Sequence, residues 1–307
     1  MAEGSYRVLS ERPEDEDALD IVNCRGFRRM SEAHLVRNIR EYCPGFDRRY
    51  SVVAWGGDDV IGHVLFTPVD IRLMRETVRA LLVGPVVVLP EQRRRGVGGA
   101  MLRFGHDLGR HDGFEVAFLA GIPSYYPQFG YKACYGFGKI TIDTASLPAP
   151  TRELEPWPVQ PADIEWLVDR HAAEWSDVDF ACVRGASMGE WTMPGVEALV
   201  WRTSDGRRAA YTLGATEGKL EMLLADDPVL ARVVLATVRP SELGLHPNGW
   251  FARHVLDEAW GVARADRSDA AMACELREGA LQPYLAAVDE GTRLPGRPNW
   301  VLPFVLC

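Results

Sequence analysis

Apolar residues recur at helical spacing in some parts of the chain and cluster in short runs in others. Helical spacing predicts two helices up to Tyr42, a helix over residues 97–108 and a short helical turn over residues 125–129. Short apolar runs bounded by turn residues predict strands over residues 6–9, 51–55, 60–68, 78–89, 114–120 and 137–142. This order predicts a mixed α/β sheet with helices on both faces.

A polar, proline-rich stretch between residues 146 and 158 interrupts this pattern and indicates a domain boundary. We expect one domain over residues 1–147 and a second over residues 148–307. In the second half, similar patterns predict helices over residues 163–174, 228–238 and 281–288, and strands over residues 197–201, 209–215, 219–224, 270–276 and 300–306. The order of elements is that of a second α/β domain, and it is compatible with a degenerate copy of the first.

The composition of the 307 residues is that of an ordinary globular protein, with 47% hydrophobic and 25% charged residues. The 34 basic side chains are outnumbered by 43 acidic ones, and the net charge of −9 argues against a nucleic-acid partner. The six cysteines are scattered without a CxxC pair, so we expect neither a metal site nor a disulfide framework.

The start of the chain and its hydropathy predict a cytoplasmic protein. Residues 1–20 are acidic and polar and lack the basic and apolar regions of a signal peptide. The apolar runs stay short of the roughly 20 residues that a membrane helix needs, so no membrane partner is expected. The sequence leaves open whether the chain forms a homo-oligomer.

The strongest local signal is a glycine-rich turn between the apolar strand over residues 78–89 and the helix over residues 97–108. N–H groups in the first turn of a helix have no partner within the helix, and they lie at the positive end of its dipole. Such a turn binds a pyrophosphate, and glycines allow a close approach of the backbone. The residues concerned are Arg93, Arg94, Arg95, Gly96, Val97, Gly98 and Gly99.

Two familiar phosphate-binding motifs do not fit this turn. It lacks the Gly-Lys-Ser/Thr of a P-loop, and it lacks the spacing of the dinucleotide fingerprint after the first strand of a parallel unit. A structural alternative stays open, in which a solvated arginine run simply precedes a glycine-rich helix start.

Residues 86–99 resemble the acyl-CoA motif of the GNAT N-acetyltransferase superfamily, which reads Arg/Gln-x-x-Gly-x-Gly/Ala. Arg93, Gly96 and Gly98 fall on its three defining positions. The resemblance implies that the turn binds the pyrophosphate of acetyl-CoA. It also implies that the backbone of the preceding strand binds the pantetheine arm, at Val86, Val87 and Val88.

Two flanking segments strengthen the likeness, which covers about residues 5–145. Residues 61–69 are similar to the third strand of the family, and residues 122–131 are similar to its Tyr-x-x-x-Gly-Phe signature. The second segment is also similar to Eis-type acetyltransferases, which carry a degenerate second GNAT domain and a third domain. The resemblance therefore implies a GNAT fold followed by a degenerate GNAT-like domain, in a chain too short for the third.

The activity implied is transfer of an acetyl group from acetyl-CoA to a primary amine, by direct attack in a ternary complex and without a metal. Tyr126 matches the family tyrosine that lies near the thioester sulfur and would act as general acid, although an aromatic packing role is its alternative. A non-catalytic acyl-CoA-binding sensor is the alternative from a different class. The amine acceptor, a small molecule or a peptide, is not specified by the sequence.

The general base is not specified either, because residues 81–89 contain no carboxylate. Three sources stay open: a water molecule, His63, whose side chain has a suitable ordinary pKa, or the C-terminal carboxylate of Cys307, as in Eis-type enzymes.

The second half offers fewer signals. Asp177, Asp179 and Glu190 could attract an amine, although solvated charge is the commoner role of such residues. The strand over residues 219–224 leads into the next helix without a glycine turn, so we expect one CoA site per chain.

Overall fold

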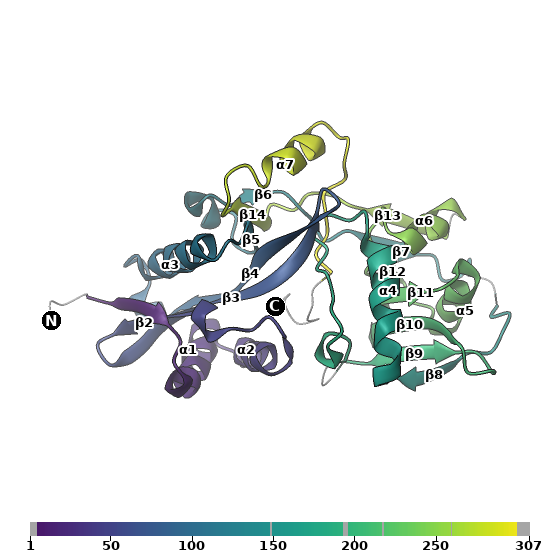
Figure 1. Ribbon diagram of the computed structural model, residues 1–307, viewed down its shortest axis with the longest axis horizontal. Coiled ribbons are helices and arrows are strands. Elements are labelled where there is room, and N and C mark those ends of the chain that lie inside the picture. The colour runs from purple at the N-terminus through teal and green to yellow at the C-terminus, as the bar shows by residue number, and fades with distance from the viewer. Residues whose placement is uncertain (1–4, 148, 193–195, 217, 259, 300–307) are drawn as a thin grey trace.

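The computed structural model describes residues 5–147, 149–192, 196–216, 218–258 and 260–299. Within these residues the strands form two seven-stranded sheets on the two sides of the molecule, each with helices packed on it (Figure 1). The mixed α/β class predicted from the sequence is confirmed. None of the helices in these ranges has the length and apolar character that a membrane span requires.

The first sheet has the order β1-β2-β3-β4-β5-β14-β6, and its neighbours are antiparallel except for β4 and β5. Its strands are β1 (Arg7–Ser10), β2 (Ser51–Gly56), β3 (Asp59–Leu73), β4 (Glu76–Val88), β5 (Val116–Ala120), β6 (Lys132–Ala133) and β14 (Ala271–Glu275). The helices on this sheet are α1 (Glu16–Phe27), α2 (Ser31–Tyr42), α3 (Val97–His111) and α7 (Gln282–Asp289).

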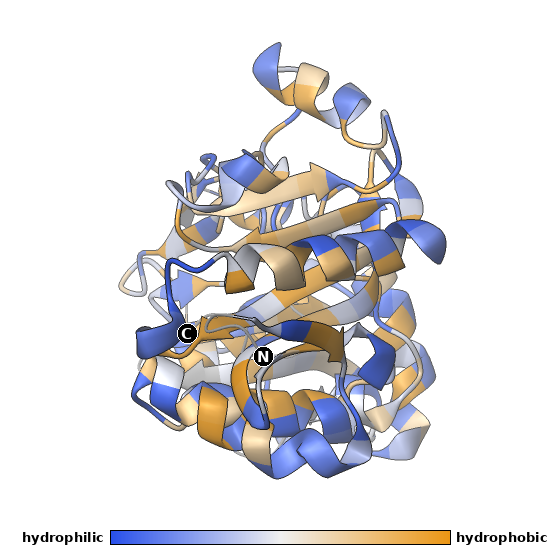
Figure 2. Cartoon of the chain, turned by 90° about the vertical axis from the view of Figure 1, so that its left-hand side faces the viewer, coloured by the Kyte–Doolittle hydropathy of each residue, from blue (hydrophilic) through white to orange (hydrophobic). Residues whose placement is uncertain are grey.

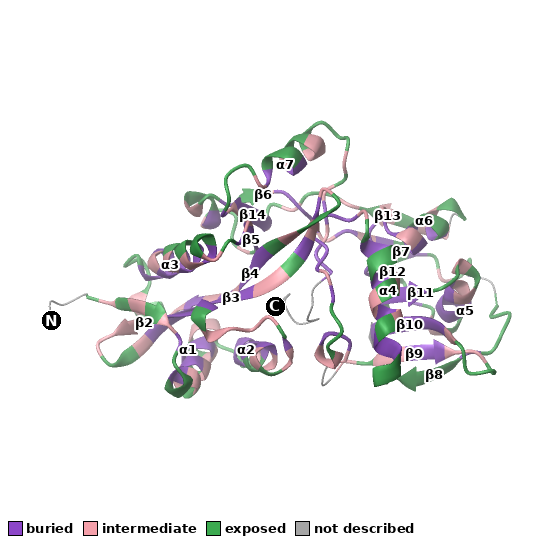
Figure 3. Ribbon diagram, viewed as in Figure 1, coloured by how far each residue is buried: buried purple, intermediate pink, exposed green. Residues whose placement is uncertain are grey.

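Alternation along the strands explains why this sheet needs helices on both faces. Successive side chains of a strand point to opposite faces. On β3, Val64 packs in the cluster that contains Met101 of α3, whereas Leu65 packs in the cluster that contains Ile39 of α2. The strands of this sheet are accordingly largely hydrophobic, while the helices carry many hydrophilic residues (Figure 2). The buried residues follow the middle strands of both sheets (Figure 3).

The second sheet has the order β13-β7-β12-β11-β10-β9-β8. Its strands are β7 (Lys139–Ile142), β8 (Glu155–Pro158), β9 (Ala198–Arg202), β10 (Arg208–Thr216), β11 (Lys219–Ala225), β12 (Glu242–Leu243) and β13 (Gly261–Arg264). The helices on it are α4 (Ile164–Trp175), α5 (Pro228–Val238) and α6 (Trp250–Asp257). The short elements β6, β8, β12, β13 and α6 were not predicted, because such brief segments show no clear period.

Two strands lie in the opposite sheet from the one that their order in the chain predicts. β7, expected to close the first half, pairs with β12 and β13 of the second sheet. β14, expected in the second half, inserts between β5 and β6 of the first sheet, with Ala273 opposite Phe118. The prediction is wrong here because an apolar run indicates burial without indicating the partner strand.

The division of the chain at residues 147 and 148 stays a prediction about folding units, since the two sheets exchange strands across it. The terminal strand predicted over residues 300–306 lies outside the described residues.

Carboxylates anchor the turn between β3 and β4 to the second half. The backbone N–H of Met74 donates a hydrogen bond to Asp179 at 2.6 Å, and Arg293 Nε donates to the same carboxylate at 2.7 Å. Asp177 forms an ion pair with Arg75 at 3.0 Å. These two aspartates are therefore engaged in the contact between the halves, which speaks against a role in attracting an amine.

Glu174 of α4 is buried against the first turn of α6. The backbone N–H of Phe251 donates a hydrogen bond to its carboxylate at 2.7 Å. Burial raises the pKa of Glu174 from 4.5 to about 8, against the opposing effect of the N–H groups of Phe251 and Ala252. A carboxyl group whose pKa is raised on folding binds more protons in the folded state. Its contribution to stability is therefore lost as the pH rises from about 4.5 to about 8.

The variant Glu174→Gln keeps an acceptor oxygen and removes the titrating proton. We expect the free energy of unfolding of the unmodified protein to fall more steeply than that of the variant, by roughly 1.4 kcal/mol per pH unit across this range. Urea unfolding at a series of pH values measures the difference. Glu165→Gln, which removes an exposed carboxyl from the same helix, is the control. Parallel curves for Glu174→Gln and the unmodified protein would contradict the prediction.

Candidate active site

A cavity of about 620 Å³ lies where β4 ends and α3 begins. It is lined by Gly26, Phe27, Val86, Val87, Val88, Gln92, Arg93, Arg94, Gly96, Val97, Gly98, Gly99, Arg103, Ile122, Tyr125, Tyr126, Gln128 and Phe129. The structure thus brings together Tyr126 and all the residues predicted to bind the cofactor except Arg95. The Arg95 guanidinium instead donates a hydrogen bond to the side chain of Gln92.

The separation of β4 from β5 forms one wall of this cavity. Their parallel pairing ends at Leu82 and Phe118, whereas β4 continues to Val88. The side chains of Val86 and Val88 pack toward α3, and the side chain of Val87 is buried toward α1. The peptide groups on this edge of β4 are therefore placed to bind an extended ligand, as an added strand would bind.

Arg93 and two left-handed residues shape the turn before α3. The Arg93 guanidinium donates hydrogen bonds to the backbone oxygens of Val88 and Gly26, both at 3.0 Å, so it joins the turn to β4 and α1. Arg94 and Gly96 have φ angles of 61° and 81°. Gly96 is the N-cap of α3 and supplies no side-chain acceptor, which leaves the first N–H groups of the helix available to an anion.

Gly98 and Gly99 let two aromatic rings approach the first turn of α3. A Cβ atom at Gly98 would lie 2.7 Å from the hydroxyl oxygen of Tyr125, and one at Gly99 would lie 3.0 Å from the ring of Phe129. The two rings meet edge to face with centroids 5.3 Å apart. The wall opposite the start of the helix is therefore aromatic.

The charged side chains that line the cavity are all arginines, namely Arg93, Arg94 and Arg103. No aspartate or glutamate of the described residues lines it, although the whole chain has a net charge of −9. Uncompensated positive charge at the start of a helix favours an anionic ligand.

Tyr126 begins the short helical turn η4 (Tyr126–Phe129) and is 7% exposed. Its ring contacts those of Tyr125 and Tyr131 edge to face, with centroids 5.2 and 5.7 Å away. The Tyr131 hydroxyl in turn lies 2.9 Å from Nε2 of the buried His106. Burial raises the pKa of the Tyr126 phenol above its ordinary value of 10, so the hydroxyl is protonated at neutral pH.

Residues 12–134 match the family model of the acetyltransferase (GNAT) domain. YjhQ of Escherichia coli K12, described as an uncharacterized N-acetyltransferase, is 32% identical over 122 residues, which are 39% of this chain and 67% of that protein. YhbS of the same strain, described in the same words, is 30% identical over 125 residues, 41% of this chain and 72% of that protein. The chain belongs to the GNAT N-acetyltransferase family. It is therefore an acyltransferase, which favours the enzyme over the sensor interpretation.

Solved GNAT structures share the fold of nearly the whole chain. A GCN5-related N-acetyltransferase from Kribbella flavida has a TM-score of 0.68 at 20% identity, covering 90% of this chain and 73% of that one. Eis1 from Mycobacterium abscessus has a TM-score of 0.60 at 16% identity, covering 91% of this chain and 75% of that one. These likenesses extend over both sheets and confirm the GNAT fold with a second α/β half.

The structure adds residues to the GNAT cavity that the motifs did not reveal. Some were within reach of sequence reasoning, because they neighbour Tyr126 or lie one helical turn beyond Gly99. Others come from the end of α1, and no pattern in the sequence connects them to the glycine-rich turn. The added residues are Gln92, which neighbours Arg93, together with Gly26, Phe27, Arg103, Ile122, Tyr125, Gln128 and Phe129.

His63 is not placed to act as the general base of this GNAT enzyme. It is fully buried on β3, where Asn23 Nδ2 donates to Nδ1 at 3.0 Å and Nε2 lies 2.9 Å from Ser51 Oγ. Burial lowers its pKa to about 3, and the charge of Arg40 adds to this shift. Because both ring nitrogens have partners within the core, neither is free to take a proton from a substrate.

The other candidates for acid–base or charge roles lie elsewhere. Glu190 accepts hydrogen bonds from the backbone N–H groups of Gly185 and Ser187 at 2.9 and 3.3 Å, so its carboxylate stabilises a turn of the second half. The carboxylate of Cys307 lies outside the described residues.

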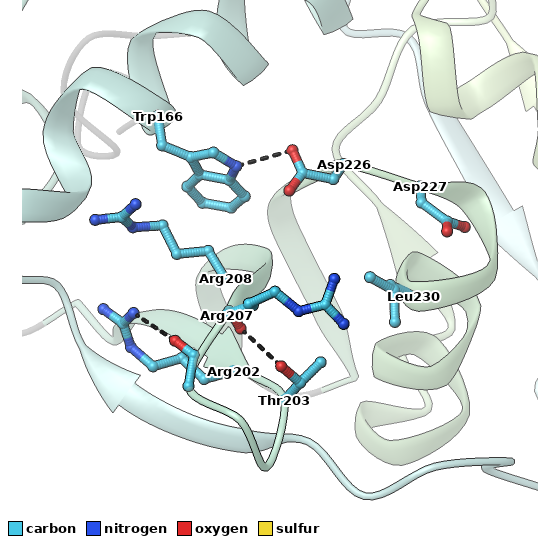
Figure 4. A pocket seen from close by; sticks show the side chains of 9 residues that line it. Trp166, Arg202, Thr203, Arg207, Arg208, Asp226, Asp227 and Leu230 are labelled. Carbon is cyan, nitrogen blue, oxygen red and sulfur yellow. Dashed lines mark hydrogen bonds between the residues drawn. The ribbon is translucent and has the colours of Figure 1, made fainter.

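The second half has a pocket of about 510 Å³ at the start of α5, which likewise follows a strand (Figure 4). Here Asp227 is the N-cap, and its carboxylate accepts a hydrogen bond from the N–H of Val229 at 2.6 Å. Asp226 beside it accepts a hydrogen bond from Trp166 Nε1 at 2.8 Å. Arg202, Arg207 and Arg208 also line this pocket, but the Asp227 carboxylate already accepts from the helix start, where two carboxylates disfavour a phosphate. One CoA site per chain stays a prediction.

Because His63 is buried in the core, we predict that its imidazole does not titrate near the ordinary histidine pKa. We expect the ring signals of His63 in an NMR titration to stay unchanged as the pH falls through the ordinary histidine value of 6.5, because the imidazole stays neutral. The variant His63→Gln assigns these signals by their disappearance. A midpoint near the ordinary value would contradict the buried, neutral state and return His63 to the candidates for general base.

Proposed function

We propose that the chain is an acetyl-CoA-dependent N-acetyltransferase that transfers the acetyl group to a primary amine by direct attack in a ternary complex. The observation that carries the proposal is the cavity at the start of α3, which has arginines and no carboxylate in its lining and has Tyr126 in its wall. CoA combines phosphates with a long, uncharged amide arm. This combination matches a helix start that favours anions, next to a free strand edge.

The binding roles follow from what each segment offers. The N–H groups from Gly96 to Gly99 would bind the pyrophosphate, with Arg94 adding positive charge. Arg93 would act by holding the turn against β4 and α1, because its guanidinium already donates to two backbone oxygens. The edge of β4 over residues 86–88 would bind the amide groups of the pantetheine arm.

The chemistry requires two proton movements. The nitrogen of the neutral amine attacks the thioester carbonyl, a new C–N bond forms, and the C–S bond breaks with release of the CoA thiolate. Tyr126 would donate its proton to the leaving sulfur, because its buried phenol is protonated at neutral pH. The proton lost by the amine would pass to water or to the C-terminal carboxylate of Cys307, since His63 has no free ring nitrogen.

The second half would help to shape the acceptor site, because it supplies β14 beside β5 and anchors the β3–β4 turn. The acceptor itself is an amine, either a small molecule or a peptide. A screen of amines by release of the CoA thiol identifies the class.

Calorimetric titration with acetyl-CoA tests the cavity as the cofactor site. We expect one molecule per chain to bind, and Gly98→Glu to abolish binding. The new side chain would add a negative charge to the helix start and displace the Tyr125 hydroxyl, which lies 2.7 Å from the position of a Cβ atom. Ser204→Glu adds the same charge on an exposed turn of the second half and should leave binding intact. Binding of acetyl-CoA by a folded Gly98→Glu protein would contradict the proposal.

The variant Tyr126→Phe tests the general acid. We expect kcat to fall roughly 100-fold or more while the Kd of acetyl-CoA stays the same, because only the hydroxyl is lost and the ring is kept. Tyr42→Phe, at the end of α2 and outside the cavity lining, is the matched control. Unchanged turnover in Tyr126→Phe would leave the residue with a packing role.

A further inference from the structure

Arg103 differs from most arginines of this chain because no ion pair joins it to a carboxylate of the described residues. It is exposed on α3, one helical turn beyond Gly99, and it lines the cavity. On the same helix Arg110 pairs with Asp107 at 2.8 Å. An unpaired guanidinium on a cavity wall is available to an anionic ligand.

The ring of Phe129 holds Arg103 at the start of the helix. The guanidinium carbon lies 5.8 Å from the ring centroid, within the range of a cation–π contact. A Cβ atom at Gly99 would lie 3.4 Å from Arg103 Nη2 as well as close to the Phe129 ring, so both groups converge beside the first turn of α3. Helical side chains point back toward the N-terminus, which carries this guanidinium toward the end that favours anions.

The other arginines of the turn serve different purposes. Arg93 donates to backbone oxygens, and Arg95 donates to Gln92 and does not line the cavity. Arg94 lies within the turn itself, nine residues before Arg103, which lies on α3. The cavity therefore offers one cation at the turn and a separate one at Arg103, which fits a ligand with two separate anionic groups.

We propose that Arg103 binds the 3′-phosphate of CoA and makes the enzyme selective for CoA over 3′-dephospho-CoA; this rests on the proposed function, because CoA must occupy the cavity. The 3′-phosphate is a monoester, which carries nearly two negative charges at neutral pH. The guanidinium fork can donate two parallel hydrogen bonds to such a group. The guanidinium carbon lies over the Phe129 ring, and the structure shows no hydrogen bond from Arg103 to a side chain of the described residues.

The test measures the Kd of CoA and of 3′-dephospho-CoA for the unmodified protein and for Arg103→Gln. We expect the unmodified protein to bind CoA at least about tenfold more tightly than the dephosphorylated form, as one charge-assisted interaction implies. In Arg103→Gln the Kd of CoA should rise about tenfold, the Kd of 3′-dephospho-CoA should stay the same, and the selectivity should disappear. Arg110→Gln, which removes an equal charge from the same helix, should retain the selectivity.

The other outcomes overturn either the assignment of the 3′-phosphate to Arg103 or the proposed function itself. If the unmodified protein binds both ligands equally well, or if Arg103→Gln weakens both equally, the assignment of the 3′-phosphate to Arg103 fails while the cofactor site stands. If Arg94→Gln rather than Arg103→Gln removes the selectivity, the phosphate is bound at the turn and the assignment fails. If the unmodified protein binds neither ligand, the proposed function itself fails.

Discussion

Strands β4 and β5 pair in parallel only as far as Leu82 and Phe118, and the way they part determines the shape of the cavity. Beyond this point β4 keeps its antiparallel partner β3, so it stays in the sheet while its other edge faces the cavity. α3 begins shortly after the same strand ends. A strand edge suited to an extended arm and a helix start suited to an anion are therefore neighbours, and their spacing is set by the backbone rather than by mobile side chains.

The distribution of charged side chains complements this arrangement of strand edge and helix start. The chain is acidic overall, yet the described cavity lining contains arginines and no carboxylate. Many carboxylates elsewhere are engaged by arginines, as Asp163 is by Arg202 and Arg208 at 2.7 and 2.6 Å. The two halves thus share a strand-to-helix connection, but a carboxylate caps the helix α5 in one and a glycine caps the helix α3 in the other.

The exchange of strands makes the two halves depend on each other. β14 comes from the end of the chain, yet it pairs with β5 and contributes Met272 and Cys274 to the core cluster that includes Tyr126 and Tyr131. Cys274 Sγ lies 3.9 Å from Nε2 of His106, next to the hydrogen bond between His106 and Tyr131. The surroundings of the proposed general acid are therefore completed by residues about 150 positions away in the sequence.

The sequence by itself determined the α/β class, most helices and strands, and the turn that carries Gly96, Gly98 and Gly99, because periodicity and turn chemistry are local properties. Only the tertiary structure decided which sheet β7 and β14 join, since an apolar run does not specify its partner. It also decided that His63 is a neutral core residue, because its partners Asn23 and Ser51 come from other elements. The pKa of a side chain depends on burial and on neighbours brought together by folding, and a local apolar pattern does not specify those neighbours.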